Sequence, residues 1–435
     1  MRSEIRERIE KIKKGEVPEG YKKVNRRILP CEWEIIPLKN IITELKSGVS
    51  VNSEDKTCEK GEYGILKTSC VSKGKFLSSE NKKIIDADLK RAKLNPKKGL
   101  IIISRMNTPD LVGEIGYVDK DYDNLFIPDR LWQTVFSVEV VSRWLAYLLT
   151  TYRLRNTIKN IATGTSNSMK NISKDKFLNI EIDYPPYIEQ RKIADILSTW
   201  DKAIELKEKL IDQKKEQKRG LMKKLLTGKI RLSEFNTRWQ RVQLGDVFER
   251  VTRKNTVNNT NVLTISAQRG LINQEDFFSK SIASSILDNY YLLKKGEFAY
   301  NKSYSNGYPM GAIKRLNMYE SGVVTTLYIC FKIKNDSNTN SDFFEQYFES
   351  GLLNYKLTKI AQEGGRAHGL LNVSPSDFFK ITITIPGKGE QEAIAKILCT
   401  ADKEINLHQQ ELEALKLQKK GLMQLLLTGI VRVNN

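Results

Sequence analysis

The sequence predicts an α+β protein in which two globular domains of mixed helix and strand alternate with two long helices. Three observations lead to this prediction: an internal repeat, a heptad pattern within each copy of the repeat, and short β-rich runs between the copies. We expect the helices to pair as an antiparallel coiled coil with pseudo-two-fold symmetry. The expected segments are an N-terminal helical segment (1–30), a first domain (31–187), a first long helix (188–232), a second domain (233–388) and a second long helix (389–435).

The internal repeat divides the chain into corresponding halves. Residues 189–232 align without a gap on residues 390–433, and 22 of the 44 aligned positions are identical. Each copy opens with Glu-Gln and closes with Leu-Leu-Thr-Gly, whereas the residues between the copies differ almost completely. Self-similarity of this kind indicates a duplicated architecture, so we predict two variable segments, each followed by a shared one.

Each copy of the repeat has the pattern of a long helix. It begins after a proline (Pro186 or Pro386) and continues to Thr-Gly, where glycine readily ends a helix. A helix of about 39 residues would span roughly 58 Å. Residues at alternate steps of four and three form a mainly apolar seam, as in a coiled coil. The seam comprises Ile193, Leu197, Trp200, Ile204, Lys207, Ile211, Lys214, Lys218, Leu221 and Leu225 in the first copy, and Ile394, Leu398, Ala401, Ile405, His408, Leu412, Leu415, Lys419, Leu422 and Leu426 in the second.

The segments between the repeats have the pattern of compact α+β domains. Short β-rich runs at 99–104, 134–138 and 327–333 alternate with turns rich in Gly, Asn, Ser and Asp. Residues 143–156 and 343–358 have helical spacing instead. Each segment is close to the ~150 residues of a typical single domain.

The charge of the chain suggests a polyanionic partner. Lys and Arg exceed Asp and Glu by 20, and the excess is spread over both halves of the sequence. Such a distribution favours nucleic acid, because each cation placed on a phosphate releases a counterion. The alternative from charge alone is a basic protein that has no such partner.

Cysteine and histidine usage narrows the chemistry further. The five cysteines are scattered without a C-x-x-C pair, which favours a reducing cytoplasm over disulfides or structural zinc. Only two histidines are present, and we expect His408 to be a packing residue of the seam. No apolar run approaches the ~18 residues of a membrane span, and the first fifteen residues lack the apolar core of a signal peptide.

Two sequence patterns approach catalytic motifs without matching them. Pro109-Asp110 is followed by Glu114, but the lysine of a nuclease motif is missing. In Asp183-Tyr-Pro-Pro186, a tyrosine separates the acid from the prolines that a DNA amino-methyltransferase needs beside it. A G-x-x-x-x-G-K-[ST] phosphate loop is also missing from the sequence. We therefore expect the chain to be non-catalytic, with no cofactor or metal of its own.

The repeated text identifies a family. The residues that carry the resemblance are Gly20-Tyr-Lys-Lys23 and Trp33, then Glu189-Gln190 with Ile193-Ala194, and the string Lys218-Arg-Gly-Leu-Met-Lys-Lys-Leu-Leu-Thr-Gly228 with its second copy Lys419-Lys-Gly-Leu-Met-Gln-Leu-Leu-Leu-Thr-Gly429. Over essentially its whole length, the chain resembles the specificity subunits of type I restriction–modification systems.

The resemblance implies a function for each segment. Each variable domain would be a target recognition domain that reads one half of a split, asymmetric site in double-stranded DNA. The helices would fix the gap between the half-sites and dock two methyltransferase (modification) subunits. S-adenosylmethionine would be bound by those subunits, and ATP and Mg²⁺ by the restriction motor–nuclease subunits.

Two alternatives stay open at the level of sequence. The chain could be the recognition subunit of a type II enzyme that cuts on both sides of its site. It could also be a coiled-coil adaptor that binds proteins instead of DNA. Salt would separate the adaptor from a DNA reader, because DNA binding weakens steeply as the salt concentration rises.

Base-reading residues are expected among polar side chains on loops of the two variable domains, with lysines on phosphates. One pair of loops aligns between the domains, namely residues 164–168 and residues 364–369, which include His368. The candidates are Lys67, Thr68, Lys73, Arg105, Asn107, Ser166 and Asn167 in the first domain, and Gln268, Arg269, Asn301, Lys302, Tyr304, Arg366 and His368 in the second.

Overall fold

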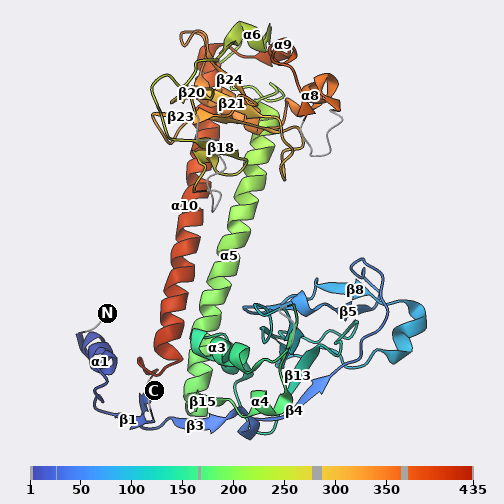
Figure 1. Ribbon diagram of the computed structural model, residues 1–435, viewed down its shortest axis with the longest axis vertical. Helices are drawn as coiled ribbons and strands as arrows, with labels where there is room; N and C mark the ends of the chain where they lie inside the picture. The colour runs from blue at the N-terminus through green and yellow to red at the C-terminus, as the bar shows by residue number, and fades with distance from the viewer. Residues whose placement is uncertain (1–2, 26, 165–167, 277–286, 364–370, 434–435) are drawn as a thin grey trace. The chain divides into compact units, whose positions relative to one another are not determined.

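The computed structural model of the chain describes residues 3–25, 27–164, 168–276, 287–363 and 371–433 (Figure 1). The chain divides into two compact units. The first unit contains residues 1–206 and 412–435, and the second contains residues 207–411. Within these units we call residues 31–186 the first arm and residues 233–387 the second arm.

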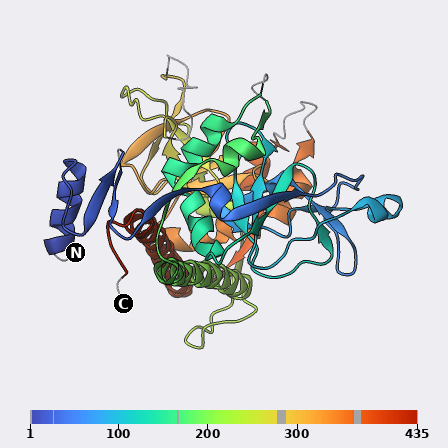
Figure 2. The same ribbon diagram turned by 90° about the horizontal axis from the view of Figure 1, so that it is seen from below.

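The two long helices are α5 (Tyr187–Leu225) and α10 (Lys388–Leu426), each of 39 residues. In the first unit, Asp201 of α5 binds Lys419 of α10 at 2.6 Å. In the second unit, Lys218 of α5 binds Asp402 of α10, also at 2.6 Å. The helices therefore run antiparallel, as predicted, and Figures 1 and 2 show them side by side. Among the described residues, no helix is long and apolar enough to cross a membrane.

Most of the predicted apolar seam is buried, with one correction. Leu221 was expected on the seam but is 39% exposed, whereas its neighbour Met222 is buried. The reason is that Met222 packs with Leu225 in the hydrophobic core of the second arm, which fixes the rotation of this last helical turn. Buried seam residues are Ile193, Leu197, Ile204, Ile211 and Leu225 of α5, and Ile394, Leu398, Ile405, Leu412 and Leu426 of α10.

The first unit has a mixed six-stranded sheet with strand order β4-β13-β9-β11-β7-β6, and a smaller sheet β12-β5-β8. Helices α2 and α3 divide the predicted helical stretch between them. The elements are α1 (Ser3–Lys13), β1 (Tyr21–Val24), β2 (Arg27–Pro30), β3 (Glu34–Pro37), η1 (Leu38–Asn40), β4 (Ile42–Ser47), β5 (Gly64–Leu66), η2 (Thr68–Cys70), β6 (Val71–Ser72), β7 (Gly74–Phe76), β8 (Asn81–Lys83), η3 (Asp86–Arg91), β9 (Ile101–Ser104), β10 (Met106–Asn107), β11 (Ile115–Tyr117), β12 (Leu125–Phe126), β13 (Leu131–Phe136), α2 (Ser142–Leu149), α3 (Tyr152–Ile161), β14 (Lys170–Asn171), α4 (Lys174–Leu178) and β15 (Glu181–Tyr184).

The second unit has an antiparallel sheet with strand order β17-β24-β21-β22. This order matches β4-β13-β9-β11 of the first unit, so the two arms share a frame. The elements are β16 (Gln240–Gln243), α6 (Leu244–Val247), β17 (Phe248–Arg250), β18 (Leu263–Ser266), β19 (Gly270–Asn273), β20 (Tyr291–Lys294), β21 (Phe298–Asn301), β22 (Ala312–Arg315), β23 (Ser321–Val324), β24 (Ile329–Ile333), α7 (Ser341–Glu349), α8 (Asn354–Ile360), β25 (Gln362–Glu363), β26 (Leu371–Asn372), α9 (Pro375–Phe379) and β27 (Thr382–Ile385).

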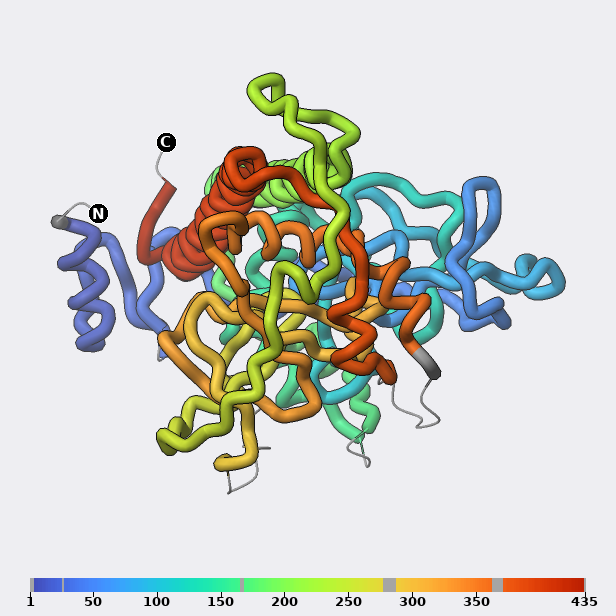
Figure 3. The backbone as a smooth tube through the Cα atoms, turned by 90° about the horizontal axis from the view of Figure 1, so that it is seen from above, coloured from blue at the N-terminus to red at the C-terminus, as the bar shows by residue number. Residues whose placement is uncertain are grey.

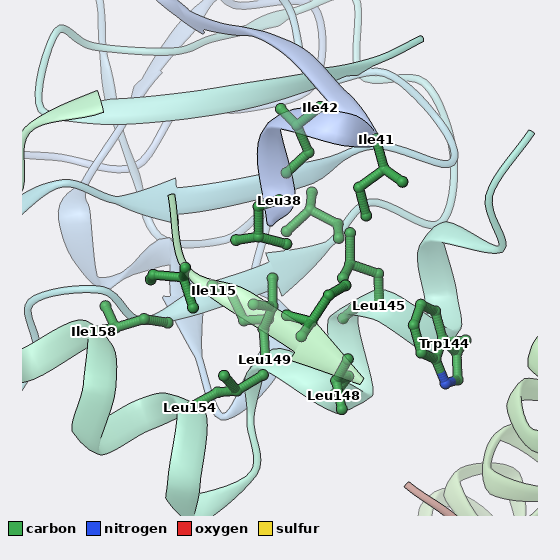
Figure 4. Packing of buried hydrophobic residues seen from close by; sticks show 14 of the residues in the cluster. Leu38, Ile41, Ile42, Ile115, Trp144, Leu145, Leu148, Leu149, Leu154 and Ile158 are labelled. Carbon is green, nitrogen blue, oxygen red and sulfur yellow. The ribbon is translucent and has the colours of Figure 1, made fainter. Parts of the chain in front are cut away.

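Each arm is built around a core that includes the end of a long helix. In the first arm, Leu145 and Leu149 of α2 face Leu154 and Ile158 of α3 beneath the sheet (Figure 4). The last turn of α10 contributes Leu426 and Leu427 to this cluster, and the last turn of α5 supplies Leu225 and Leu226 to the second arm. The Leu-Leu pair that recurs in the repeat therefore closes a domain core in both units.

The first residue of the repeat, Glu189, joins the two ends of the chain in the first unit. Its carboxylate accepts hydrogen bonds from the indole of Trp33 at 2.9 Å and from the guanidinium of Arg432 at 2.8 Å. Nearby, the Tyr21 hydroxyl donates to the backbone oxygen of Gly429 at 2.7 Å, and Figures 2 and 3 show both chain ends in this region.

Glu390 makes the same contacts in the second unit. It accepts from Trp239 at 3.1 Å and from Arg231 at 2.6 Å. Here a continuous stretch of chain follows α5 and supplies both partners. Glutamate therefore occurs at this position in both copies of the repeat for a structural reason. Each carboxylate links the start of an arm to the start of a long helix through a hydrogen bond from a tryptophan indole.

Candidate nucleic-acid interface

Basic residues gather at one end of the central sheet of the first arm. Strand β9 finishes at this end, and β13, β11 and β7 begin there, because β9 is antiparallel to β13 and β11 while β7 is parallel to β11. Arg105 directly follows β9, Arg130 precedes β13 and Lys73 precedes β7. In the described ranges, no carboxylate lies within ion-pair distance of these three side chains. Two carboxylates at this end are engaged elsewhere, since Glu114 pairs with Arg155 and Asp129 accepts from Ser50. The sheet end therefore carries three cations that no ion pair among the described residues neutralises.

Local contacts hold this sheet end in place. The Arg105 Nε donates to the backbone oxygen of Asp129 at 2.7 Å, and its guanidinium carbon lies 6.0 Å from the Trp132 ring centroid. Lys73 has a positive φ of 51°, and its backbone N–H donates to the Glu114 carboxylate at 2.6 Å. These contacts fix the backbone and leave the Lys73 ammonium group exposed.

A separate two-stranded sheet begins directly after this sheet end. Strand β10 pairs with β14, which places Asn107 opposite Lys170. The Asn107 side chain is engaged locally, because its Nδ2 donates to Ser104 Oγ at 3.1 Å and its Oδ1 accepts from the next backbone N–H. β14 closes the loop that contains the candidates Ser166 and Asn167, which themselves lie outside the described residues.

The second arm has the corresponding arrangement with different side chains. Asn301 ends β21, and the backbone oxygen of the following Lys302 accepts a hydrogen bond from Leu371 at 3.0 Å. Leu371 begins β26, which closes the loop containing Arg366 and His368, and these two candidates also lie outside the described residues. Partial burial lowers the pKa of Lys302.

Tyr304 lies in the connection between β21 and β22 and is 64% exposed. An exposed aromatic ring beside a basic sheet end is suited to contact a sugar or a base. In the first arm, the sheet end therefore brings the predicted residues Arg105 and Lys73 together. In the second arm, the predicted residues Asn301, Lys302 and Tyr304 lie at the end of β21 and directly after it.

Gln268 and Arg269 lie elsewhere in the second unit, in the exposed turn between β18 and β19. They line a cleft of about 490 Å³ together with Lys218 of α5 and Lys403 of α10. Across the ranges that the structure describes, Arg269 and Lys403 have no carboxylate within ion-pair distance. The cleft thus has two free cations, one from the arm and one from a long helix.

Lys67 and Thr68 do not join the other candidates of the first arm. They precede β6, which is antiparallel to β7, so they lie at the far end of this hairpin from Lys73. Lys67 is also within 3.9 Å of the Glu80 carboxylate, which offsets its charge.

Sequence reasoning missed Arg130 and Lys403. Arg130 follows Pro128-Asp129, and this turn places Arg130 at the sheet end directly before β13. Lys403 belongs to the Asp-Lys pair that recurs in the repeat, but it was attributed to the helix. In both cases the available signal was a basic residue next to a feature interpreted as purely structural.

Comparison with known proteins identifies the family. The model of the type I restriction modification DNA specificity domain matches residues 30–215 and again residues 236–417. The chain belongs to this family.

Each match covers one arm and much of the long helix that follows it. The type I restriction enzyme MjaVIII specificity subunit of Methanocaldococcus jannaschii is 25% identical over 452 residues, covering 96% of this chain and 97% of that protein.

Solved structures agree with the fold of this specificity subunit. The S subunit of a type I restriction–modification system from M. genitalium matches with a TM-score of 0.54 at 16% identity, over 93% of this chain and 97% of that chain. A second solved structure, which concerns complex assembly and conformational transition of a type I restriction–modification system, contains a chain that also matches with a TM-score of 0.54. The two chains are 15% identical, and the match covers 93% of this chain and 99% of that chain. At these identities the likeness concerns the fold.

The acidic side chains of the two patterns that approach catalytic motifs form ion pairs within the first unit. Glu114 forms a 2.9 Å ion pair with Arg155 in addition to its bond to Lys73. Asp183 is buried on β15, where it binds Arg27 at 3.0 Å and Arg153 at 2.6 Å. Within the described ranges, His, Cys, Asp and Glu form no group of three that could hold a metal ion.

Proposed function

We propose that this specificity subunit recognises a split, asymmetric sequence in double-stranded DNA, with one arm reading each half. The observation that carries the proposal is the contrast between a shared frame and unlike loops. Both arms have the same four-strand order and the same glutamate contacts. However, Arg105 and Asn107, which follow β9, correspond in place to Lys302 and Tyr304, which follow β21. Two equal scaffolds with different reading residues suit two different half-sites.

The paired helices would set the gap between the half-sites. Each helix has 39 residues, or roughly 58 Å of length at ~1.5 Å per residue, which exceeds one turn of B-DNA at ~34 Å. The type II alternative would use the same subunit with different partners.

The same helices would dock two methyltransferase subunits, with the restriction motor–nuclease subunits joining the complex. Exposed leucines on otherwise polar helices favour such docking, since Leu206, Leu407 and Leu417 are all more than half exposed. This chain would be non-catalytic and would work in the cytoplasm. S-adenosylmethionine would be bound by the methyltransferase subunits, and ATP and Mg²⁺ by the motor–nuclease subunits.

The test is to purify the chain with the methyltransferase subunit encoded beside it and to map methylated bases in DNA exposed to the complex. The expected result is a motif of two unlike half-sites around a fixed gap, with a methylated base in each half. A single continuous motif would contradict the split-site proposal, and the absence of any complex or methylation would contradict the proposed partners.

A further inference from the structure

We propose that Asp201 and Asp402 are positioning residues: each holds one arm at a fixed place on the helix pair and thereby sets the number of base pairs between the half-sites. The proposal rests on the proposed function, because a gap has meaning only for a split site. We do not expect Asp201 or Asp402 to contact a base or a phosphate. Their effect on DNA recognition would pass entirely through the placement of the arms.

In the first unit, the Asp201 carboxylate connects three elements. The Tyr147 hydroxyl, on α2 of the arm, donates to Asp201 Oδ2 at 2.6 Å. The Lys419 ammonium, on α10, donates to Asp201 Oδ1 at 2.6 Å and lies 5.0 Å from the Tyr147 ring centroid. Burial and the Asp201 carboxylate raise the pKa of Tyr147, so the phenol stays protonated and remains a donor.

In the second unit, Asp402 connects the corresponding three elements. Gln346 Nε2, on α7 of the arm, donates to Asp402 Oδ2 at 2.7 Å. Lys218, on α5, donates to both carboxylate oxygens at 2.6 and 2.7 Å. The aspartate and the lysine occupy equivalent positions of the repeat, whereas the donor from the arm has changed from a tyrosine to a glutamine.

The exposure of these aspartates distinguishes them from residues that the fold requires. The side chains of Asp201 and Asp402 are 31% and 46% exposed, whereas those of Glu189 and Glu390 are 5% and 2% exposed. A carboxylate in contact with water can lose its partners without leaving a buried charge. Asp201 and Asp402 can therefore orient an arm while contributing little to whether it folds.

A cleft lies beside each aspartate, so arm and helix are not closely packed against each other at this place. Tyr147 and Asp201 line a cleft of about 390 Å³ in the first unit, and Gln346 and Asp402 line the cleft of about 490 Å³ in the second. The hydrophobic core that each arm shares with the long helices resists displacement of the arm. Beside these clefts, where side chains do not fill the space between arm and helix, the polar contact adds to that resistance.

The geometry of DNA makes this resistance relevant to the gap. One additional base pair moves a half-site by about 3.4 Å and rotates it by about 35°, since a turn of ~34 Å contains 10 to 10.5 base pairs. An arm that followed this movement would break a hydrogen bond of 2.6 Å, because such bonds weaken steeply with distance and angle. Intact contacts at Asp201 and Asp402 therefore penalise every gap except the preferred one.

The experiment uses the complex with the methyltransferase subunit and a DNA library with both half-sites and gaps one or two base pairs shorter or longer than preferred. The variants are Tyr147→Phe, which removes one oxygen atom, together with Asp201→Ala and Asp402→Ala. We expect methylation at gaps changed by one base pair to rise about tenfold relative to the preferred gap, with both half-site sequences unchanged. Unchanged gap preference in all three variants would overturn the proposal.

Lys207→Met and Lys214→Met are matched controls. These lysines form ion pairs of 2.6 Å with Glu411 and Glu404, and both partners are on α10 rather than on an arm. We expect both controls to keep the strict gap, and equal relaxation in them would overturn the proposal in favour of general helix stiffness. If the wild-type complex methylates no split motif, the proposed function fails together with this inference. A wild-type split motif with unchanged variants refutes the inference alone.

Discussion

The helix pair has a different character in the two units. In the second unit, Lys207, Lys214 and Lys218 of α5 each form an ion pair with an acid of α10. In the first unit, Lys419 of α10 forms the equivalent ion pair with Asp201 of α5 at 2.6 Å. The pair that occurs in both units is the one that also contacts an arm. The repeat thus preserves the contact between the helices that also attaches an arm.

The two arms share a frame but differ in the residues that the frame presents. Their frames agree in strand order and in the glutamate contacts at the helix starts, whereas the strand ends and hairpins have unlike side chains. Residues of the long helices that attach an arm are constant between the units, and residues on the proposed reading surface of the arm vary. Comparing equivalent residues of the two units therefore separates these roles experimentally.

The largest expected difference concerns the glutamates at the helix starts. Replacing Glu189 with alanine leaves the fully buried Trp33 indole without its acceptor and removes one of the two carboxylate partners of Arg432, the other being Glu32. We expect a loss of about 3 kcal/mol in unfolding free energy, measured by urea denaturation. Glu390→Ala should cost only about 1–2 kcal/mol, because Trp239 is half-buried and its indole can reach water.

Glu392→Ala is the control for both, because that side chain is 53% exposed and should change stability little. Equal losses for Glu189→Ala and Glu390→Ala would mean that burial of the indole does not decide the difference between the units.

A smaller difference between the units is expected in the salt dependence of DNA binding, for Lys202, which follows Asp201, and Lys403, which follows Asp402. Lys202 lies 3.9 Å from the Glu205 carboxylate, whereas Lys403 faces the basic cleft with Arg269. If the cleft contacts a phosphate, Lys403→Ala should reduce the slope of log affinity against log salt by about 0.9. Lys202→Ala should leave the slope unchanged. Fluorescence anisotropy of the complex on labelled DNA would measure both, and identical slopes for Lys403→Ala and the wild type would argue against a phosphate there.

The large features of the fold were predictable because they depend on periodic patterns. The two helices and their pairing follow from the heptads, which by themselves allow either direction, and the runs at 99–104 and 327–333 contain β9 and β24. Leu221 was placed wrongly because the last turn of α5 leaves the seam and enters the core of the second arm. That rotation depends on tertiary packing, which heptad spacing does not contain.

The candidate site was only partly predictable, because strand register brings its residues together. Arg130 reaches the sheet end through the pairing of β13 with β9, and Lys67 is separated from Lys73 by the reversal between β6 and β7. Lys67 and Lys73 are only six residues apart in the sequence, yet they lie at opposite ends of one hairpin. Residue type alone identified loop cations, and the structure decided which of them share a surface.

The smallest expected effect is a pH dependence confined to one part of the helix pair. Hydrogen bonds and ion pairs from Lys214 and Lys207 lower the pKa of Glu404 and Glu411 below the usual 4.5. A folded-state pKa that is depressed gives stability that is present above pH 4.5 and is lost as the pH falls through the lowered value. Acid should therefore loosen residues 207–225 and 388–411 more than residues 187–206 and 412–426, where apolar seam residues dominate.

Hydrogen exchange, corrected for the intrinsic effect of pH, would measure this difference between pH 6 and pH 3.5. The double variant Lys207→Met/Lys214→Met should reduce the additional acid sensitivity, because the lysine contribution to each lowered pKa is lost and only that of His408 remains. The effect should be modest, since these carboxylates are in contact with solvent and salt screens them. Equal acid sensitivity along the whole helix pair would show that the ion pairs of the second unit do not distinguish it from the first.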